Sequence, residues 1–394
     1  MIIDEAHRIS KSSNDQSGND GSIQPVVKYN GERAEKVYCP LSQTLSLIYC
    51  AKVCVFLIDD HQAVKFTETG NSTQIEHDAK NYSSLITSEV SDFRDSIEKL
   101  KLKLQDTKDQ LAQLNPLADA QSKKKYSRLL KKEKNTETEI FRDEEGLKNI
   151  HSTFSGNVKV EVCTLQTQFR CLGGDRYINW LDQVLYKSPR EISYELKKGD
   201  YDFKLYDNPV NLYNEICRLN GMKQTVARLV AGWCWEWRSG KNQLTEDGDL
   251  KKEVCFNYTD ADGSKRLFEL PWETNGSHPR GEYKMKYAPS AESWASDSMG
   301  INQTGCIYSA QGFEFDYVGV IIGPDLVYDE VNDCLKGKKK NNFEREIQHC
   351  KDDNEADRLI RNCYRVLMSR GHKGCYVYCC DPKVADYLRR FMAK

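Results

Sequence analysis

The residues of this chain whose types suit catalysis stand where apolar runs end. The acidic pair Asp4-Glu5 follows Ile2-Ile3 directly, and Gln62 stands just beyond a longer apolar run at 53–58. A continuous apolar run predicts a buried parallel strand, and polar side chains at its carboxyl end lie at an edge of the sheet. An acidic pair after an apolar run is common, so the pattern indicates catalysis only if further polar residues accompany it.

Three later stretches add amides and cations at similar places. LQTQFRC (165–171) puts Arg170 beyond an apolar run, and YRVLMSRG (364–371) puts Arg365 and Arg370 around the end of a predicted helix. SAQGFEFDYVGVIIG (309–323) puts three residues before a buried strand, namely Gln311, Gly312 and Glu314. Carboxylates, amides and arginines together suit phosphoryl transfer to water, since that reaction depends on placing water and neutralising charge. The alternative for each residue is a structural role as a cap, a loop hydrogen bond or a salt bridge.

Taken in order, these stretches resemble motifs II to VI of superfamily 1 helicases. The chain is more similar still to the Schlafen group-3-like DNA/RNA helicase domain family. The segments that carry this resemblance are CRLNGMKQTVARLVAGWCWEW, SAQGFEFDYVGVIIGPDL and LIRNCYRVLMSRGHKGCYVY. The resemblance implies an α/β fold of the P-loop NTPase type, with two RecA-like lobes of which the first is incomplete. It also implies an ATP-dependent DNA or RNA helicase or translocase, with nucleic acid as its partner and ATP and Mg²⁺ as its cofactors.

The resemblance also assigns roles to the residues named above. Asp4 would hold Mg²⁺ through water, and Glu5 would orient the attacking water. Gln62 would sense the γ-phosphate, while Arg170 and Arg370 would bring cations from the second lobe to the developing charge. The remaining residues would contact the nucleotide or transmit its state to the nucleic acid: Gln311, Gly312, Glu314 and Arg365.

The phosphate loop that such a site requires has no counterpart in the sequence. Gly-Lys occurs only at 240–241 and 337–338, followed by Asn242 and Lys339 where Ser or Thr is needed. Met1 stands where the strand before the acidic pair expects an apolar residue. We therefore expect an internal methionine taken as a start, or a broken gene, and no activity of the chain alone. The alternatives are a separate polypeptide that supplies the missing half and a degenerate, non-catalytic binding module.

A helical segment interrupts the α/β pattern and divides the chain into 1–83, 84–150 and 151–394. Apolar residues at spacings of three and four predict a coiled-coil-like seam, broken once by Thr107. Asn115-Pro116 ends this helix, and a second helical stretch follows, so we expect an antiparallel hairpin. The seam residues of the first helix are Val90, Phe93, Ile97, Leu100, Leu104, Leu111 and Leu114.

The second helical stretch carries the basic sequence KKKYSRLLKKEK at 123–134. Lysine clusters attract phosphates, so these residues are candidates for nucleic-acid contact. The alternative is a solvated helix face. A rival function for the whole chain follows, that of a non-catalytic nucleic-acid- or protein-binding module that uses this hairpin. The candidate residues are Lys123, Lys124, Lys125, Lys131 and Lys132.

Composition sets the remaining expectations. The chain has 394 residues, a net charge of -2 and 15 cysteines, with no run of about 18 apolar residues. The cysteines lack a C-x-x-C pair and are expected to be reduced thiols of a cytoplasmic protein. The segment 226–237 is predicted as a strand, so Trp233, Trp235 and Trp237 would share one face, for core packing or for base stacking.

Overall fold

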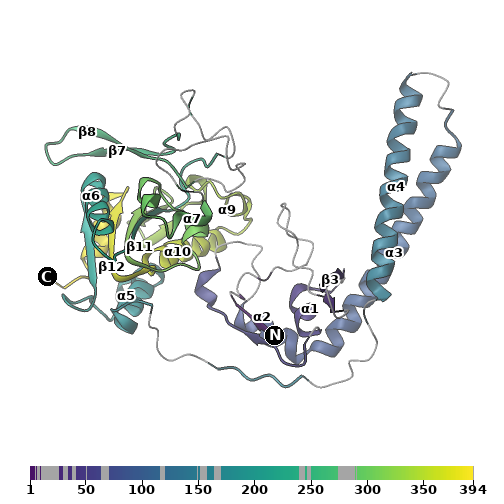
Figure 1. The fold of residues 1–394 in the computed structure, drawn as a ribbon, viewed down its shortest axis with the longest axis horizontal. Helices are drawn as coiled ribbons and strands as arrows, with labels where there is room; N and C mark the ends of the chain where they lie inside the picture. Colours follow the sequence, from purple (N-terminus) through teal and green to yellow (C-terminus); the bar gives the residue numbers. More distant parts are fainter. Residues whose placement is uncertain are drawn as a thin grey trace. The chain divides into compact units, whose positions relative to one another are not determined.

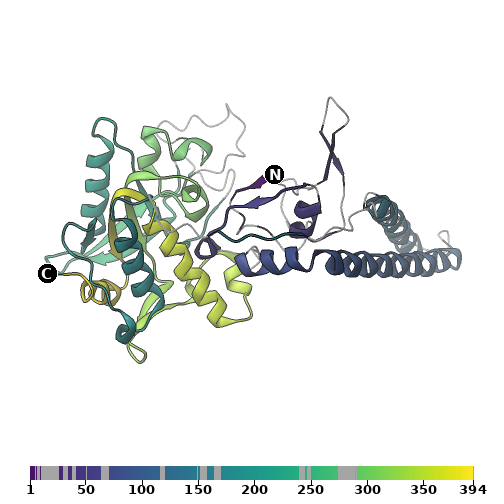
Figure 2. The ribbon, with the colours of Figure 1, turned by 90° about the horizontal axis from the view of Figure 1, so that it is seen from below.

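The computed structural model separates the chain into two compact units (Figures 1 and 2). Unit 1 comprises residues 1–60 and 67–163, and unit 2 comprises residues 61–66 and 164–394. The structure describes residues 1–4, 6, 9, 26–29, 34–37, 41–49, 51–63, 71–115, 120–148, 150, 158–163, 170–238, 245, 250–273, 289 and 291–393.

Unit 1 contains a short parallel strand pair. β1 (Ile2–Ile3) pairs with β4 (Val55–Phe56), so the acidic residue after β1 and the polar residues after β4 leave the pair in the same direction. A separate antiparallel pair joins β2 (Val26–Tyr29) and β3 (Ala34–Val37). α1 (Gln43–Tyr49) and α2 (Ser72–Lys80) contribute Leu45, Ile48 and Ala79 to a small core.

Two long helices make up the rest of unit 1. α3 (Tyr82–Ala112) and α4 (Ala120–Lys148) lie side by side as a hairpin (Figures 1 and 2). Lys101 bonds Glu144 at 3.1 Å and Lys108 bonds Glu137 at 2.8 Å. Seven residues forward on α3 therefore correspond to seven residues back on α4, which is an antiparallel register. The residues most buried along the hairpin include Ile97, Thr107, Leu129 and Ile140.

Unit 2 is built on a four-stranded parallel sheet. Its strands are β5 (Asp202–Tyr206), β6 (Ala227–Ala231), β9 (Phe315–Ile322) and β12 (Gly371–Cys379), in the order β5-β12-β9-β6. All three pairings are parallel. The α/β class predicted from the sequence is confirmed at this level, while the RecA-like character of the lobes stays a prediction.

Helices and a hairpin cover the two faces of this sheet. α5 (Gly174–Tyr186), α10 (Asp353–Met368) and α11 (Pro382–Arg389) share one core with Val318, Val320 and Ile322 of β9. α6 (Pro209–Asn220) and the hairpin of β7 (Val254–Thr259) and β8 (Lys265–Leu270) share the other core with Ile321. Because side chains alternate along a strand, consecutive residues of β9 reach the two cores.

Shorter elements complete the described part of unit 2. The 3-10 turns are η3 (Pro189–Glu191), η5 (Ser298–Asn302) and η6 (Lys339–Asn341), and η2 (Asp60–Gln62) spans the junction of the two units. The remaining helices and strands are α7 (Ala291–Trp294), α8 (Ile307–Ala310), β10 (Leu326–Asp329), β11 (Cys334–Gly337) and α9 (Arg345–His349).

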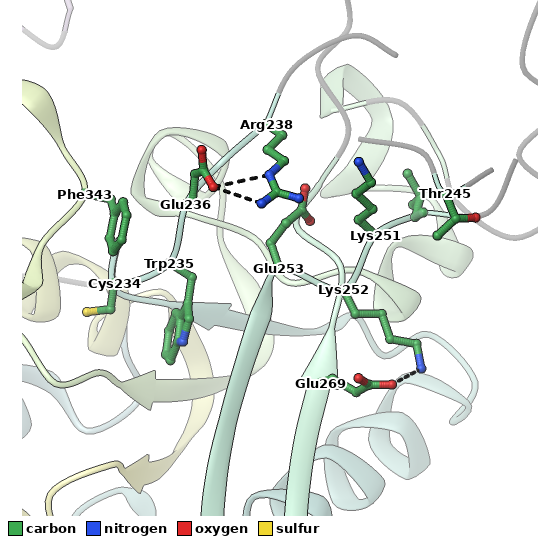
Figure 3. Close-up of a pocket in the computed structure, with 11 residues that line it drawn as sticks. Cys234, Trp235, Glu236, Arg238, Thr245, Lys251, Lys252, Glu253, Glu269 and Phe343 are labelled. Carbon is green, nitrogen blue, oxygen red and sulfur yellow. Dashed lines mark hydrogen bonds and ion pairs between the residues drawn. The ribbon is translucent and has the colours of Figure 1, made fainter. Parts of the chain in front are cut away.

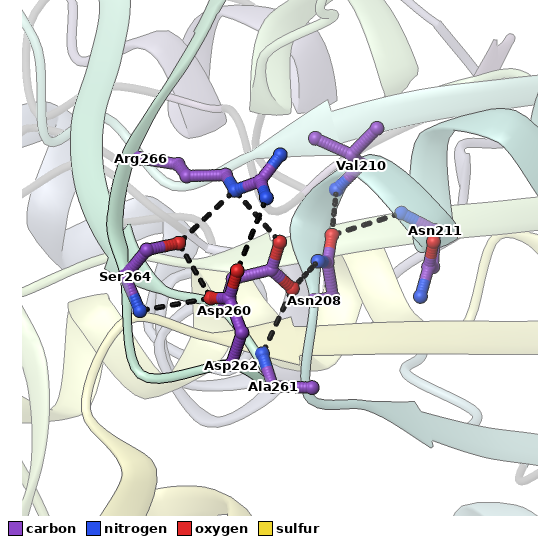
Figure 4. A network of polar contacts seen from close by, with 8 residues as sticks. All are labelled: Asn208, Val210, Asn211, Asp260, Ala261, Asp262, Ser264 and Arg266. Carbon is purple, nitrogen blue, oxygen red and sulfur yellow. Dashed lines mark hydrogen bonds and ion pairs between the residues drawn. The ribbon is translucent and has the colours of Figure 1, made fainter.

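A polar network fastens the turn of the β7–β8 hairpin to the start of α6 (Figure 4). Asn208 caps α6, because its Oδ1 accepts from the Val210 and Asn211 backbone N–H groups at 2.8 and 3.1 Å. Its Nδ2 donates to Asp260 Oδ1 at 2.9 Å, and Arg266 pairs with the other oxygen of Asp260 at 2.8 Å. The Asn208 side chain thus satisfies two backbone N–H groups at the start of α6 and also holds the turn of the β7–β8 hairpin.

The strand predicted at 226–237 is shorter than expected. β6 ends at Ala231, whose partner Ile321 lies one residue before the end of β9. Among the described residues, no strand pairs with the segment that follows Ala231, so the tryptophans lie outside the sheet. Trp235 stacks on Phe256 with 5.5 Å between ring centroids, and all three tryptophans pack partly buried against the core. Core packing, one of the two predicted roles, is what their positions show.

Glu273 is a buried carboxyl group in unit 2. It is 5% exposed, and its backbone N–H donates to the Thr304 carbonyl at 3.0 Å. Loss of hydration raises the pKa of Glu273 from 4.5 to about 7, against the lowering effect of hydrogen bonds with Cys306 and Ser309. A raised pKa means that the folded chain binds a proton more tightly than the unfolded chain in this interval.

This carboxyl group predicts a pH dependence of stability. The stability that protonated Glu273 gives the folded chain is complete below a pH of about 4.5 and is lost as pH rises through about 7. The ionised carboxylate then lowers the free energy of unfolding by roughly 3 kcal/mol. Urea unfolding at several pH values measures this. Glu273→Gln should flatten the fall in unfolding free energy with rising pH. The control, Glu269→Gln, changes a more exposed residue that pairs with Lys252, and it should leave this pH dependence unchanged. An unaltered slope in Glu273→Gln would contradict the assignment.

Candidate functional site

Most of the predicted site residues of unit 2 gather at the amino edge of the parallel sheet. The Phe315 N–H, at the start of β9, donates to the Arg370 carbonyl at 2.9 Å, directly before β12 begins. Gln311 and Gly312 lie between α8 and β9 at this edge. Gly312 has φ +89°, a conformation that favours glycine, and an added Cβ would meet no atom within 4 Å. Its requirement for glycine is therefore conformational.

Gln62 is held at the same edge by two residues. Gln311 Nε2 donates to the Gln62 carbonyl at 3.2 Å, and Arg370 Nη2 donates to Gln62 Oε1 at 3.3 Å. All three residues belong to unit 2, because the segment 61–66 packs with it. Gln62 thus meets residues that are 249 and 308 positions away in the sequence, one through its backbone carbonyl and one through its side chain. The resemblance to helicase motifs had grouped these three residues into one predicted site, and their roles in it stay predictions.

Arg370 is enclosed by backbone carbonyls as well as by Gln62. It is 1% exposed, and its Nε and Nη1 donate to the carbonyls of Val366 and Phe313 at 3.1 and 3.4 Å. The cation stands immediately after α10 and its C-cap Ser369, where the helix dipole favours positive charge. Its position is fixed by α10 on one side and by the turn before β9 on the other.

Asn362 and Tyr186 hold the residue after Gln62 and were missed by sequence reasoning. Asn362 is 1% exposed, and its Nδ2 donates to the Ala63 carbonyl at 2.7 Å. Tyr186 donates its hydroxyl to Asn362 Oδ1 at 2.6 Å, so both ends of the amide are engaged. Asparagine on the buried face of a helix is unfavourable without such partners. That polar residue within the apolar periodicity of LIRNCYRVLM was the available signal.

The other predicted arginines form ion pairs. Arg170 Nε bonds Glu314 Oε1 at 3.0 Å, and the Arg170 carbonyl contacts Nδ1 of His372 on β12 at 3.0 Å. Arg365 Nε bonds Asp182 of α5 at 2.5 Å. Arg170 and Glu314 therefore belong to the same edge as Gln311, whereas Arg365 joins α10 to α5. The predicted catalytic and nucleotide-binding roles of these residues stay predictions.

The local electrostatics agree with a cationic edge. Cys171 is buried beside Arg170, and loss of hydration raises the pKa of its thiol to about 11, while the charges of Arg170 and Arg370 act in the lowering direction. Cys171 Sγ donates to the Ser369 carbonyl at 3.4 Å. Its thiol is therefore protonated at neutral pH and serves packing.

In unit 1, Asp4 follows β1 as predicted and its side chain is exposed. The Ala6 N–H donates to the Leu57 carbonyl at 2.9 Å, which keeps the turn after β1 beside the end of β4. Glu5, the predicted water-orienting residue, lies outside the described residues. Asp60 has a structural role, because its Oδ1 accepts from the Ser72 N–H at 2.8 Å and its Oδ2 accepts from the Ser72 hydroxyl at 2.5 Å.

The described residues fit the predicted cofactors only in part. One exposed carboxylate, Asp4, suits magnesium bound through water. Within the described ranges no group of three or more His, Cys, Asp or Glu side chains is placed to hold a metal ion. The sequence also lacks a loop whose amides would cradle phosphates.

A cavity lies beyond the opposite, carboxyl edge of the sheet (Figure 3). It has a volume of about 640 Å³ and follows β6, with Cys234, Trp235 and Phe343 among its lining residues. The cations near it are largely neutralised, because Arg238 bonds Glu236 at 3.0 Å and Lys252 bonds Glu269 at 2.5 Å. This cavity and the arginine-bearing edge are separate features of unit 2.

Comparisons with known proteins identify the family of the chain. The sequence profile of the Schlafen group 3, DNA/RNA helicase domain matches residues 1–381. The chain belongs to this family. The family assignment supports a helicase-like function and an interaction with nucleic acid. It covers Asp4, the hairpin, the cluster around Gln62 and the arginines of α10.

A curated relative extends the comparison. A Saccharomyces cerevisiae protein described as "Uncharacterized protein YPL245W" is 28% identical over 253 residues, which is 58% of this chain. The matched stretch is 47% of that protein, so the chain corresponds to about half of its length. No solved structure matches the chain. Among the described residues, the helices are too short or too polar to cross a membrane.

Proposed function

We propose that this Schlafen-type helicase domain couples ATP hydrolysis to movement on DNA or RNA. The observation that carries the proposal is the meeting of Gln62, Gln311 and Arg370 at one edge of the sheet. Gln62 contacts Gln311 through its backbone carbonyl and Arg370 through its side chain, so it can report a change at one of these residues to the other. In this proposal Asp4 binds Mg²⁺ through water, and the triphosphate is cradled by a phosphate-loop segment outside the 394-residue sequence.

The first test is hydrolysis by the purified chain. We expect no ATP turnover, with or without nucleic acid, because amides and a lysine of a phosphate loop carry most triphosphate binding. A phosphate-loop segment of a related helicase, joined before Met1, should restore turnover that nucleic acid stimulates. The matched control is the same fusion with its loop lysine replaced by alanine. Turnover by the unextended chain, or none by any fusion that binds ATP, would refute the proposal.

A second candidate function is non-catalytic binding through the hairpin. The observation that favours it is the exposure of Lys123, Lys124, Lys125, Lys131 and Lys132 on α4. The two functions differ in a simple measurement. Binding of nucleic acid that never responds to ATP in the loop-bearing fusion favours the binding module, and a nucleotide-dependent affinity favours the motor.

A further inference from the structure

Two sets of cations in the hairpin have different environments. Lys101 and Lys108 of α3 bridge to Glu144 and Glu137 of α4 and thereby fix the helix pair. The cations of α4 between 123 and 134 are exposed, and within the described part of the chain no ion pair engages them. Their positive charge is therefore available to a partner, whereas that of Lys101 and Lys108 is used inside the hairpin.

The first half of α4 has an unbalanced charge. Between 120 and 134 the sequence has seven cations and one carboxylate, Glu133. From 135 to 148 it has five carboxylates and two cations. The excess of positive charge is thus confined to the part of α4 that follows the turn from α3, and it creates a local field that the net charge of the whole chain conceals.

Three of these cations share a face of the helix. Lys124, Arg128 and Lys131 recur at spacings of four and three residues, so they project from the same side of α4. Tyr126 and Leu129, which are less exposed, belong to the side that packs on α3. With a rise of about 1.5 Å per residue, the row spans about 10 Å of a rigid helix.

The chemistry of this face fits a phosphate backbone and lacks the features of a base-binding surface. Single strands are usually bound on aromatic side chains, which stack on the bases. Tyr126 is the one aromatic residue between 120 and 134, and it is partly buried on the other side of the helix. A duplex presents about one charge per 1.7 Å along its axis, a dense array suited to a short rigid row of cations.

We propose that the face of Lys124, Arg128 and Lys131 binds the sugar-phosphate backbone of duplex nucleic acid, independently of sequence. The proposal rests on the nucleic-acid partner in the proposed function, but it requires neither ATP nor a phosphate loop. The hairpin then binds the duplex through the negative charge of its phosphates, and the base sequence of the duplex does not affect the affinity.

The test compares two triple variants of the full 394-residue chain in the absence of nucleotide. Lys124→Gln/Arg128→Gln/Lys131→Gln removes the proposed face. Arg94→Gln/Lys99→Gln/Lys103→Gln removes one arginine and two lysines from exposed positions of α3, and is the matched control. Fluorescence anisotropy measures binding to a labelled duplex, to a second duplex of unrelated sequence and to a single strand, between 50 and 200 mM salt, the range over which contacts to phosphates weaken.

We expect the α4 variant to bind both duplexes roughly tenfold or more weakly, and to lower the salt slope by about 0.9 per lost contact. The control should bind like the unmodified chain, and circular dichroism should show equal helicity in all three proteins. Equal losses in both variants, an unchanged affinity and slope, or a loss confined to the single strand would each overturn the proposal. Because no nucleotide is present, these outcomes do not depend on whether the chain hydrolyses ATP.

Discussion

Replacing Arg370 by alanine is expected to lower ATP turnover by roughly 10³- to 10⁵-fold in the loop-bearing fusion, the effect of removing an arginine finger. The physical reason is that charge develops on the transferred phosphoryl group, so a nearby cation matters most in the transition state. ATP binding should stay nearly unchanged, because the phosphate loop provides the ground-state affinity. Single-turnover kinetics with a separate measurement of ATP affinity checks both expectations.

The contacts of Arg370 make a structural control necessary. Its side chain also bonds the carbonyls of Val366 and Phe313, so alanine leaves buried acceptors without a donor. Arg370→Lys keeps the positive charge but loses the planar guanidinium group. Compared with Arg370→Ala, it should recover stability more than turnover. Arg365→Ala breaks the ion pair with Asp182 and should affect stability more than turnover. Turnover of Arg370→Ala within about tenfold of the unmodified fusion would reject the finger role and leave Arg170 as the candidate.

Replacing Asp325 by alanine is expected to destabilise unit 2 by roughly 2 to 6 kcal/mol, because two buried donors lose their acceptor. Asp325 is buried beyond the carboxyl edge of the sheet, where Tyr364 donates its hydroxyl to Oδ1 and Asn342 Nδ2 donates to Oδ2 at 2.7 Å. Tyr364 in turn accepts from the Gly323 N–H at 2.9 Å. The carboxylate therefore joins α10 to the loops after β9 and β11.

Urea unfolding followed by circular dichroism measures this loss. Asp353→Ala, at an exposed residue paired with Lys339, is the control and should cost about 0.5 kcal/mol or less. Asp325→Asn should have an intermediate stability. Its amide oxygen still accepts one of the two hydrogen bonds, but its NH₂ group faces the other buried donor. A stability of Asp325→Ala within about 1 kcal/mol of the unmodified chain would show that the network contributes little.

The sequence singled out residues that lie together at one edge of the sheet, but not the contacts between them. Gln62, Gln311 and Arg370 could be selected because each follows or precedes an apolar run with a recognisable pattern. That Gln62 bonds both of the others depends on how 61–63 lies on unit 2, and no local pattern encodes it. Asn362 had a local signal as a polar residue on an apolar helix face, but its partner Ala63 is 299 residues away and was not predictable. Asp4 was placed correctly after a strand, while its role in binding magnesium is untested.

The fold shows the same division between local and distant information. The apolar runs identified β9, the seam interrupted at Thr107 identified α3, and the second helical stretch after Asn115-Pro116 identified α4. The strand predicted at 226–237 was too long, because where β6 ends depends on the end of its neighbour β9. The order β5-β12-β9-β6 was not predictable either, since parallel pairing joins strands that are far apart in the chain.

The position of β12 in that order has a consequence for how the protein is made. This strand is the last of the four to leave the ribosome, yet it lies between β5 and β9 and pairs with both. Until residues 371–379 emerge, β5 has no neighbour in the sheet and one edge of β9 is unpaired. The four-stranded sheet of unit 2 is therefore completed only after these residues emerge, and until then the nascent chain leaves one edge of the apolar strand that contains VGVII unpaired. We expect the incomplete sheet to be the stage at which this unit is most prone to pair with other extended chains.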